Sequence, residues 1–158
     1  MSQKILNRMI YGIMIVFCIT PFLFLFYLNL TANSQSISLI ELIRNNAMIT
    51  VQMLSIFLLP LAAYILKLKW DKAQDEGGHE ALYISVALLM LSMFLLNNIV
   101  HGFLALILLV VITKSYKISL KEIFTSLTHS WKSSLMTYSG ELTILVFSTI
   151  VGMILRGF

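Results

Sequence analysis

The sequence predicts an all-α integral membrane protein, organised as a single multi-pass domain over residues 1–158. Hydrophobic residues make up 59% of the chain and charged residues only 11%, whereas soluble domains carry about 25% charged residues. Long apolar stretches alternate with short polar or basic segments, and the stretch 81–113 contains no Asp, Glu, Lys or Arg. We expect about five hydrophobic helical segments, which make four to five spans and include a short hairpin, and one cytoplasmic amphipathic helix at the membrane interface.

The first span is expected over residues 9–30, after a short basic lead that contains Lys4 and Arg8. A cleaved signal peptide is the alternative, but its apolar region is about 7–15 residues long and ends at a small-x-small site. The apolar stretch here is longer, and residues 32–34 are a poor cleavage site, so we favour an uncleaved span. Pro21 removes one backbone hydrogen bond and predicts a kink in this helix.

The second span is expected over residues 47–66, and it contains the polar residue Gln52. The loop before it, 31–46, alternates apolar with polar residues and predicts a short amphipathic turn on the membrane surface. This turn could merely cover the bundle, or it could bind a partner. After the span, residues 71–80 form a strongly polar loop, in which two glycines break the helix before the next apolar stretch.

Residues 81–113 predict a tight helical hairpin in lipid, with arms over 81–97 and 99–113. A single crossing needs about 20 residues, so the stretch is too long for one span and short for two. The polar cluster near its middle, 97–102, is the expected turn. Each arm reaches about 25 Å, against roughly 30 Å of hydrocarbon. The hairpin therefore either crosses twice in a thinned bilayer or is re-entrant, and both arrangements return the chain to its starting side.

Residues 117–138 carry apolar side chains at steps of three and four, which predicts one face of an amphipathic helix. We expect this helix to lie in the cytoplasmic interface, to close the end of the bundle as a lid, or to do both. Its expected apolar face consists of Leu120, Ile123, Phe124, Leu127, Trp131, Leu135 and Tyr138.

The last span is expected over residues 142–155. Glu141 falls in its first turn, where the positive end of the helix dipole favours a carboxylate. We interpret Glu141 as an anchor at the membrane interface.

The basic residues predict an orientation in the plasma membrane, with the N-terminus cytoplasmic and the C-terminus extracytoplasmic. With the hairpin counted as two crossings, nine of the 11 Lys and Arg residues fall in cytoplasmic segments, and only Arg44 and Arg156 fall outside. This distribution follows the positive-inside rule. If 81–113 were one span, the excess of basic residues in cytoplasmic segments would vanish. The observed excess therefore favours a fold of the chain at 97–102. The nine cytoplasmic residues are Lys4, Arg8, Lys67, Lys69, Lys72, Lys114, Lys117, Lys121 and Lys132.

The sequence predicts no catalytic, cofactor or metal site. It holds no HExxH, GxSxG, CxxC or P-loop pattern. The single cysteine, Cys18, falls in mid-span and is expected to be a small buried hydrophobe. The expected topology separates the three histidines, so they do not supply the convergent ligands of a metal site. The net charge of +4 is explained by basic segments between spans, and no nucleic acid is expected as a partner.

Five polar residues inside or beside the expected spans are candidates for contact with a partner, because polar groups at membrane depth are costly unless they are partnered. The three that lie in the expected hairpin turn, Asn97, Asn98 and His101, could cap the hairpin helices in water at the outer surface. Alternatively, they could contact a protein, a peptide or an ion. Asn97 and His101, four residues apart, could share a helix face. Gln52 is expected to form a hydrogen bond between helices. The five are Gln52, Asn97, Asn98, His101 and Glu141.

These features favour a small non-enzymatic protein that acts by association in the lipid bilayer. Its partner would be another membrane protein or a membrane-active peptide. The chain would act either as an immunity protein against a membrane-active toxin or peptide, or as an accessory subunit of a larger membrane complex. A subunit of an oligomeric transporter or channel is the alternative, because Pro21, Pro60 and the hairpin supply discontinuous helices. This alternative requires a homo-oligomer. A membrane enzyme is the third hypothesis.

Overall fold

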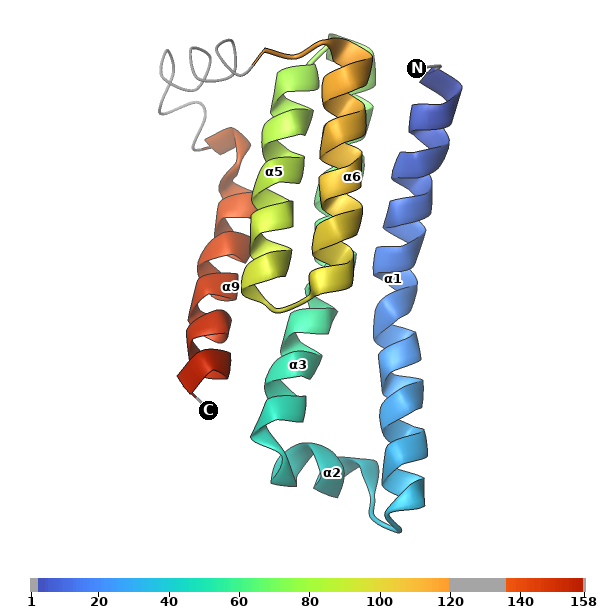
Figure 1. Ribbon diagram of the computed structural model, residues 1–158, viewed down its shortest axis with the longest axis vertical. Coiled ribbons are helices and arrows are strands. Elements are labelled where there is room, and N and C mark those ends of the chain that lie inside the picture. The colour runs from blue at the N-terminus through green and yellow to red at the C-terminus, as the bar shows by residue number, and fades with distance from the viewer. Residues whose placement is uncertain (1–2, 120–135, 158) are drawn as a thin grey trace.

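The computed structural model describes residues 3–119 and 136–157, and every regular element in this part of the chain is a helix. Figure 1 shows a long first helix beside a group of shorter ones. The prediction of an all-α chain with several apolar helices is confirmed, and three helical stretches are long and apolar enough to cross a membrane: Gln3–Ser34, Ala47–Glu76 and Ile99–Tyr116. The helices are α1 (Gln3–Ser34), α2 (Leu39–Asn45), α3 (Ala47–Phe57), α4 (Leu59–Glu76), α5 (His79–Leu95), α6 (Ile99–Tyr116) and α9 (Ser139–Gly157).

The first half of α1 belongs to a bundle with α4, α5, α6 and α9. Two hydrogen bonds fix its register: Gln3 Nε2 donates to the hydroxyl of Tyr116 at 2.8 Å, and Trp70 Nε1 donates to Asn7 Oδ1 at 3.1 Å. The start of α1 therefore lies beside the ends of α4 and α6. The core of this bundle is apolar, and its largest fully buried side chains include Leu6, Ile10, Phe17, Leu59, Leu66, Trp70, Leu82, Leu89, Met93 and Leu108.

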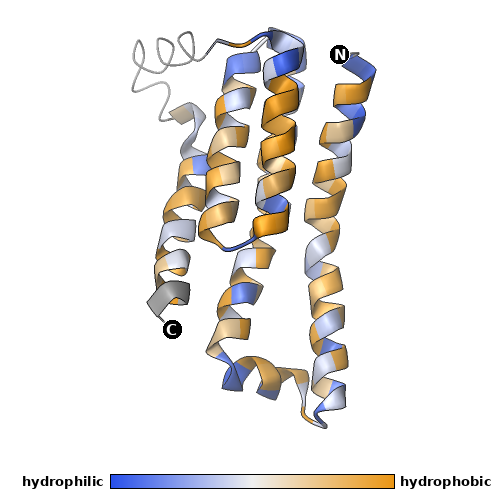
Figure 2. Ribbon diagram, in the orientation of Figure 1, coloured by the Kyte–Doolittle hydropathy of each residue, from blue (hydrophilic) through white to orange (hydrophobic). Residues whose placement is uncertain are grey.

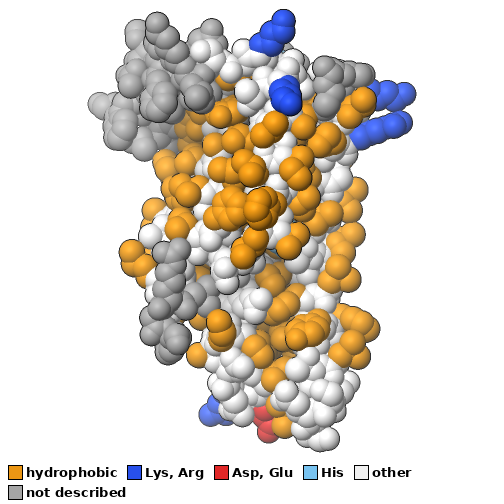
Figure 3. Space-filling model, viewed as in Figure 1, with side chains coloured by type: hydrophobic (Ala, Val, Ile, Leu, Met, Phe, Trp, Pro, Cys, Tyr) orange, Lys and Arg blue, Asp and Glu red, His pale blue; other side chains and the backbone are white. Residues whose placement is uncertain are grey.

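Basic side chains gather at this end of the bundle, as Figure 3 shows. Because the start of α1 adjoins the ends of α4 and α6, Lys4, Lys72 and Lys117 come to one end of the molecule. Arg44 lies in α2, at the opposite end (Figure 1). This arrangement matches a chain that returns to its starting side after the hairpin. We call the first of these ends the basic end.

The predicted hairpin forms, and its turn has a defined geometry. Asn97 adopts a left-handed conformation (φ 59°), and its N–H donates to the Phe94 carbonyl at 3.1 Å. The N–H of Asn98 donates to the Met93 carbonyl at 2.9 Å. This pair of bonds is the Schellman motif, which ends a helix with Gly or Asn in the left-handed position. Gly102 then lets α6 approach α5, because a Cβ there would meet the Phe94 ring at 2.8 Å.

The hairpin stops well short of the far end of α1. Nε2 of His101, in the first turn of α6, lies 3.0 Å from Oγ1 of Thr20, near the middle of α1. From Thr20 the helix continues to Ser34, about 21 Å at 1.5 Å per residue. The turn extends beyond His101 by only about 5 Å on the same scale. Figure 1 shows the remaining part of α1 running past the turn beside α3.

The segment from α2 to α4 differs in part from the prediction. The amphipathic turn is the helix α2, capped by reciprocal hydrogen bonds between Ser38 and Glu41. The second span breaks at Leu58, between α3 and α4. The polar residues 71–76, expected in a loop, instead extend α4, because no glycine or proline follows Pro60 in its first turn until Gly77, whose φ of 73° ends the helix.

The predicted amphipathic helix over 117–138 lies mostly outside the described residues. Lys117 is left-handed (φ 53°) and ends α6. Of the expected apolar face, Leu120, Ile123, Phe124, Leu127, Trp131 and Leu135 are outside the described part of the chain. Tyr138 is described, and it is buried against Ile84 of α5.

Candidate functional site

Three of the five candidate polar residues meet in one recess at the hairpin turn. It has a volume of about 80 Å³ and is lined by Met48, Gln52, Leu96, Asn97 and Asn98. The helix α3 and the turn between α5 and α6 thus bring together residues that are distant in the sequence. We call this site the turn recess.

The carboxamides of the turn recess are not satisfied by the other residues that the structure describes. Gln52 and Asn97 are exposed, and neither side chain forms a hydrogen bond with another residue of the described ranges 3–119 and 136–157. Nδ2 of Asn98 is buried and also has no partner in these ranges. The sequence predicts a hydrogen bond between helices for Gln52 and allows the asparagines to cap the hairpin. The turn is closed by backbone bonds, and Asn98 makes no side-chain cap.

The part of α1 that runs past the level of the hairpin turn has a strongly apolar surface. Beyond Thr20, α1 exposes large side chains: Phe22 is 72% exposed, Phe26 64% and Tyr27 60%. Contiguous exposed apolar surface of this kind is typical of contact with lipid or with another protein. In Figure 2, hydrophobic residues continue along α1 and α3 past the polar hairpin turn. The turn therefore lies level with apolar surface, rather than at its far edge.

His101 lies apart from the turn recess and faces α1. Besides its contact with Thr20, its ring packs edge-on against Phe17, with 5.4 Å between ring centroids. Asn97 belongs to the turn, outside α6, so these two residues do not share a helix face as the sequence allowed. His101 thus helps to fix the position of the hairpin against α1.

Glu141 forms a second polar cluster, in the bundle. Its side chain is buried, Ser85 Oγ donates to Oε1, and Lys69 Nζ lies 3.5 Å from the same oxygen. Lys69 also donates to the Thr137 carbonyl, and its Nζ lies 4.9 Å from the centroid of the Tyr138 ring. This cluster joins α4, α5 and α9. The sequence does not predict this ion pair, because no local spacing relates α4 to α9.

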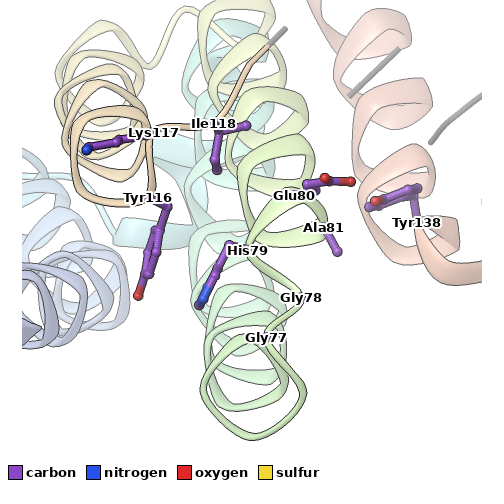
Figure 4. Close-up of a pocket in the computed structure, with 9 residues that line it drawn as sticks. All are labelled: Gly77, Gly78, His79, Glu80, Ala81, Tyr116, Lys117, Ile118 and Tyr138. Carbon is purple, nitrogen blue, oxygen red and sulfur yellow. The ribbon is translucent and has the colours of Figure 1, made fainter. Parts of the chain in front are cut away.

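A larger pocket of about 370 Å³ lies at the basic end, and Figure 4 shows its lining. The His79 ring stacks on Tyr116, with 3.6 Å between centroids and 14° between planes. Glu80 faces Tyr138 across the pocket (Figure 4). Burial, with smaller contributions from the Glu141 and Glu80 carboxylates, raises the pKa of Tyr138 to about 12, so its hydroxyl is protonated at neutral pH. The lining residues are Gly77, Gly78, His79, Glu80, Ala81, Tyr116, Lys117, Ile118 and Tyr138.

The polar side chains of this pocket do not form a nucleophile–base pair. Within the described part of the chain, no hydrogen bond joins His79, Glu80 and Tyr138 to one another, whereas such a pair requires hydrogen-bond reach. No group of three His, Cys, Asp or Glu side chains that could hold a metal occurs among the described residues. Cys18, expected to be buried, is exposed on α1.

Comparison with protein-family models, curated proteins and solved structures finds no match for this chain.

Proposed function

We propose that this chain is a non-enzymatic membrane protein that acts by associating with another polypeptide within the bilayer. The observation that carries the proposal is the exposure of the Gln52 and Asn97 carboxamides in the turn recess, at a level where α1 presents lipid-type surface. Two exposed carboxamides at this depth, with no partner among the described residues, need hydrogen-bond partners from another molecule.

Lipid does not meet this need. An unsatisfied polar group in the hydrocarbon costs several kcal/mol, whereas a carboxamide that pairs with a polar group of a neighbouring helix avoids that cost. The short hairpin also leaves the second half of α1 with few neighbours: beyond the turn it packs against α2 and α3, and its aromatic face is exposed. A partner helix would satisfy the carboxamides and cover part of this face.

Two biological roles fit such an association. One is protection against a membrane-active toxin or peptide, which would be bound at the turn recess. The other is that of an accessory subunit, which would dock on a larger membrane complex. Both roles use the same surface, and the identity of the bound polypeptide distinguishes them.

A photo-crosslinking amino acid at position 48 tests the proposal in native membranes. Met48 lines the recess and is 62% exposed, so we expect its photoproduct to include another polypeptide. Leu54 is the matched control, since it is also exposed on α3 but lies about 200° around the helix from Gln52. Adducts with lipid alone at both positions would contradict the proposal.

A subunit of a transporter or channel is the second candidate, favoured by two helix breaks in one region of the molecule. The α3–α4 break at Leu58 and the α5–α6 turn both interrupt the apolar layer, and transporters build their sites from discontinuous helices. Purified protein in sealed vesicles would then conduct or exchange a small ion. Vesicles that remain impermeable to small ions at every protein-to-lipid ratio would exclude this candidate.

A further inference from the structure

We propose that the turn recess is occupied by the same recess of a second copy of this chain, related by a two-fold axis along the membrane normal. This inference rests on the proposed function and names its partner. It begins from the three carboxamides of Gln52, Asn97 and Asn98, which line one recess and have no partner for their side-chain donors within the described residues.

The depth of the recess favours a copy over an unrelated helix. Two copies inserted with the same orientation place their recesses at the same depth, so the polar groups meet without any shift along the normal. An unrelated helix would need its own polar group at that level. A two-fold axis also makes the contact isologous, in which the same patch is used by both subunits.

The chemistry of the recess is self-complementary. A carboxamide carries both an acceptor oxygen and an N–H₂ donor, so Gln52 of one copy fits Asn97 of the partner subunit in both directions across the axis. None of the described residues that line the recess is charged. Contact between two recesses therefore brings no like charges of these residues together. Met48 and Leu96 add apolar contact beside the amides.

The surface around the recess can accept a helix. Met48 is exposed one turn from Gln52 on the same face of α3. At the other side of the turn, Ile99 and Val100 are exposed at the start of α6. Figure 3 shows hydrophobic side chains along most of the length of one face of the molecule. The carboxamides are thus set in an apolar rim, as expected for a contact between helices in lipid.

Disulfide crosslinking of the full chain in lipid vesicles tests this contact. In a Cys18→Ser background, we expect Met48→Cys to give a crosslinked dimer on mild oxidation, and Leu54→Cys, on another face of α3, to give little. Adding Gln52→Leu to Met48→Cys should weaken dimerisation at least about 3-fold, which corresponds to the average intramembrane hydrogen bond. Equal crosslinking at positions 48 and 54, or no effect of Gln52→Leu, would overturn the proposal.

A second variant separates the contact from the fold. Asn97→Gly keeps the left-handed turn and removes only the carboxamide, so it should lower the dimer fraction with an unchanged helical circular dichroism spectrum. A photo-crosslinker at position 48 that captures a different polypeptide, with no copy of this chain, would also overturn the dimer. That result would leave the proposed function intact, whereas capture of lipid alone would contradict both.

Discussion

Lys69 and Glu141 form an ion pair inside the helical bundle: Nζ of Lys69 lies 3.5 Å from Oε1 of Glu141, and both side chains are largely buried. The pair links α4 to α9, and Ser85 of α5 donates a hydrogen bond to the same carboxylate oxygen. A buried charge is tolerated when its partner is present and is strongly destabilising when the partner is removed. The position of α9 should therefore depend on this pair.

Lys69→Met should lower the free energy of unfolding by about 3–5 kcal/mol, because it leaves the Glu141 carboxylate buried without its cation. The double variant Lys69→Met with Glu141→Gln should recover most of that loss, since no net charge is then buried. Reversible unfolding in mixed micelles measures both values. A double variant as unstable as the single one would show that the ion pair does not carry this stability.

Gly152→Ala should destabilise the packing of α9 against the end of α5. A Cβ at this position would lie 2.5 Å from the Leu95 carbonyl oxygen, and backbone atoms must move to admit it. Overpacking of this kind typically costs about 1–3 kcal/mol. Gly12→Ala is the matched control, because a Cβ added there would have no atom of the described residues within 4 Å. Equal thermal stability of the two variants would refute the close approach of α9 to α5.

Asn97→Leu should destabilise the hairpin, whereas Asn97→Gly should not. Asn97 is left-handed with φ 59°, a conformation that costs a residue with a large side chain about 1–2 kcal/mol. Glycine adopts it freely. Melting temperatures in detergent should therefore fall for Asn97→Leu alone. If the two variants have the same melting temperature, residue 97 does not adopt the left-handed conformation.

The helix α2 should loosen in acid. Hydrogen bonds from the backbone N–H and hydroxyl of Ser38 lower the pKa of Glu41 below its ordinary value of 4.5. A carboxylate with a lowered pKa stabilises the fold above its unfolded-state pKa, and this contribution disappears as the pH falls through the folded-state pKa. A spin label at exposed Ile40 should gain mobility below the ordinary pKa, and Glu41→Gln should remove this step. A label with the same step in Glu41→Gln would point to another titrating group.

The elements that depend on local sequence were predictable. The fold of 81–113 into a hairpin followed from its length and the surrounding lysines, and the break before it followed from Gly77, which is left-handed. The amphipathic turn in 31–46 is the helix α2, and its capping box of Ser38 and Glu41 is a local pattern.

The features that depend on distant contacts were not predictable. The contact of His101 with Thr20 fixes the depth of the hairpin along α1. The ion pair of Lys69 with Glu141 joins α4 to α9 in the bundle. Neither pair has a periodicity or spacing that a single sequence reveals. From the sequence, Gln52, Asn97 and Asn98 were separate candidates for contact with a partner. Only the packing of α3 under the hairpin turn brings them into one recess.

The depth of the hairpin turn in the bilayer decides whether the carboxamides of the turn recess face hydrocarbon or water. Spin labels at Val100, beside the turn, and at Ile40, in α2, both replace exposed side chains; their relative accessibility to oxygen and to a water-soluble nickel complex reports depth. With Cys18→Ser as background, we predict that the Val100 label lies in the hydrocarbon, on the order of 10 Å deeper than the Ile40 label, given the length of α1 beyond Thr20. A Val100 label as accessible to the nickel complex as the Ile40 label would place the turn at the membrane surface, where water satisfies the carboxamides, and would refute the proposed association.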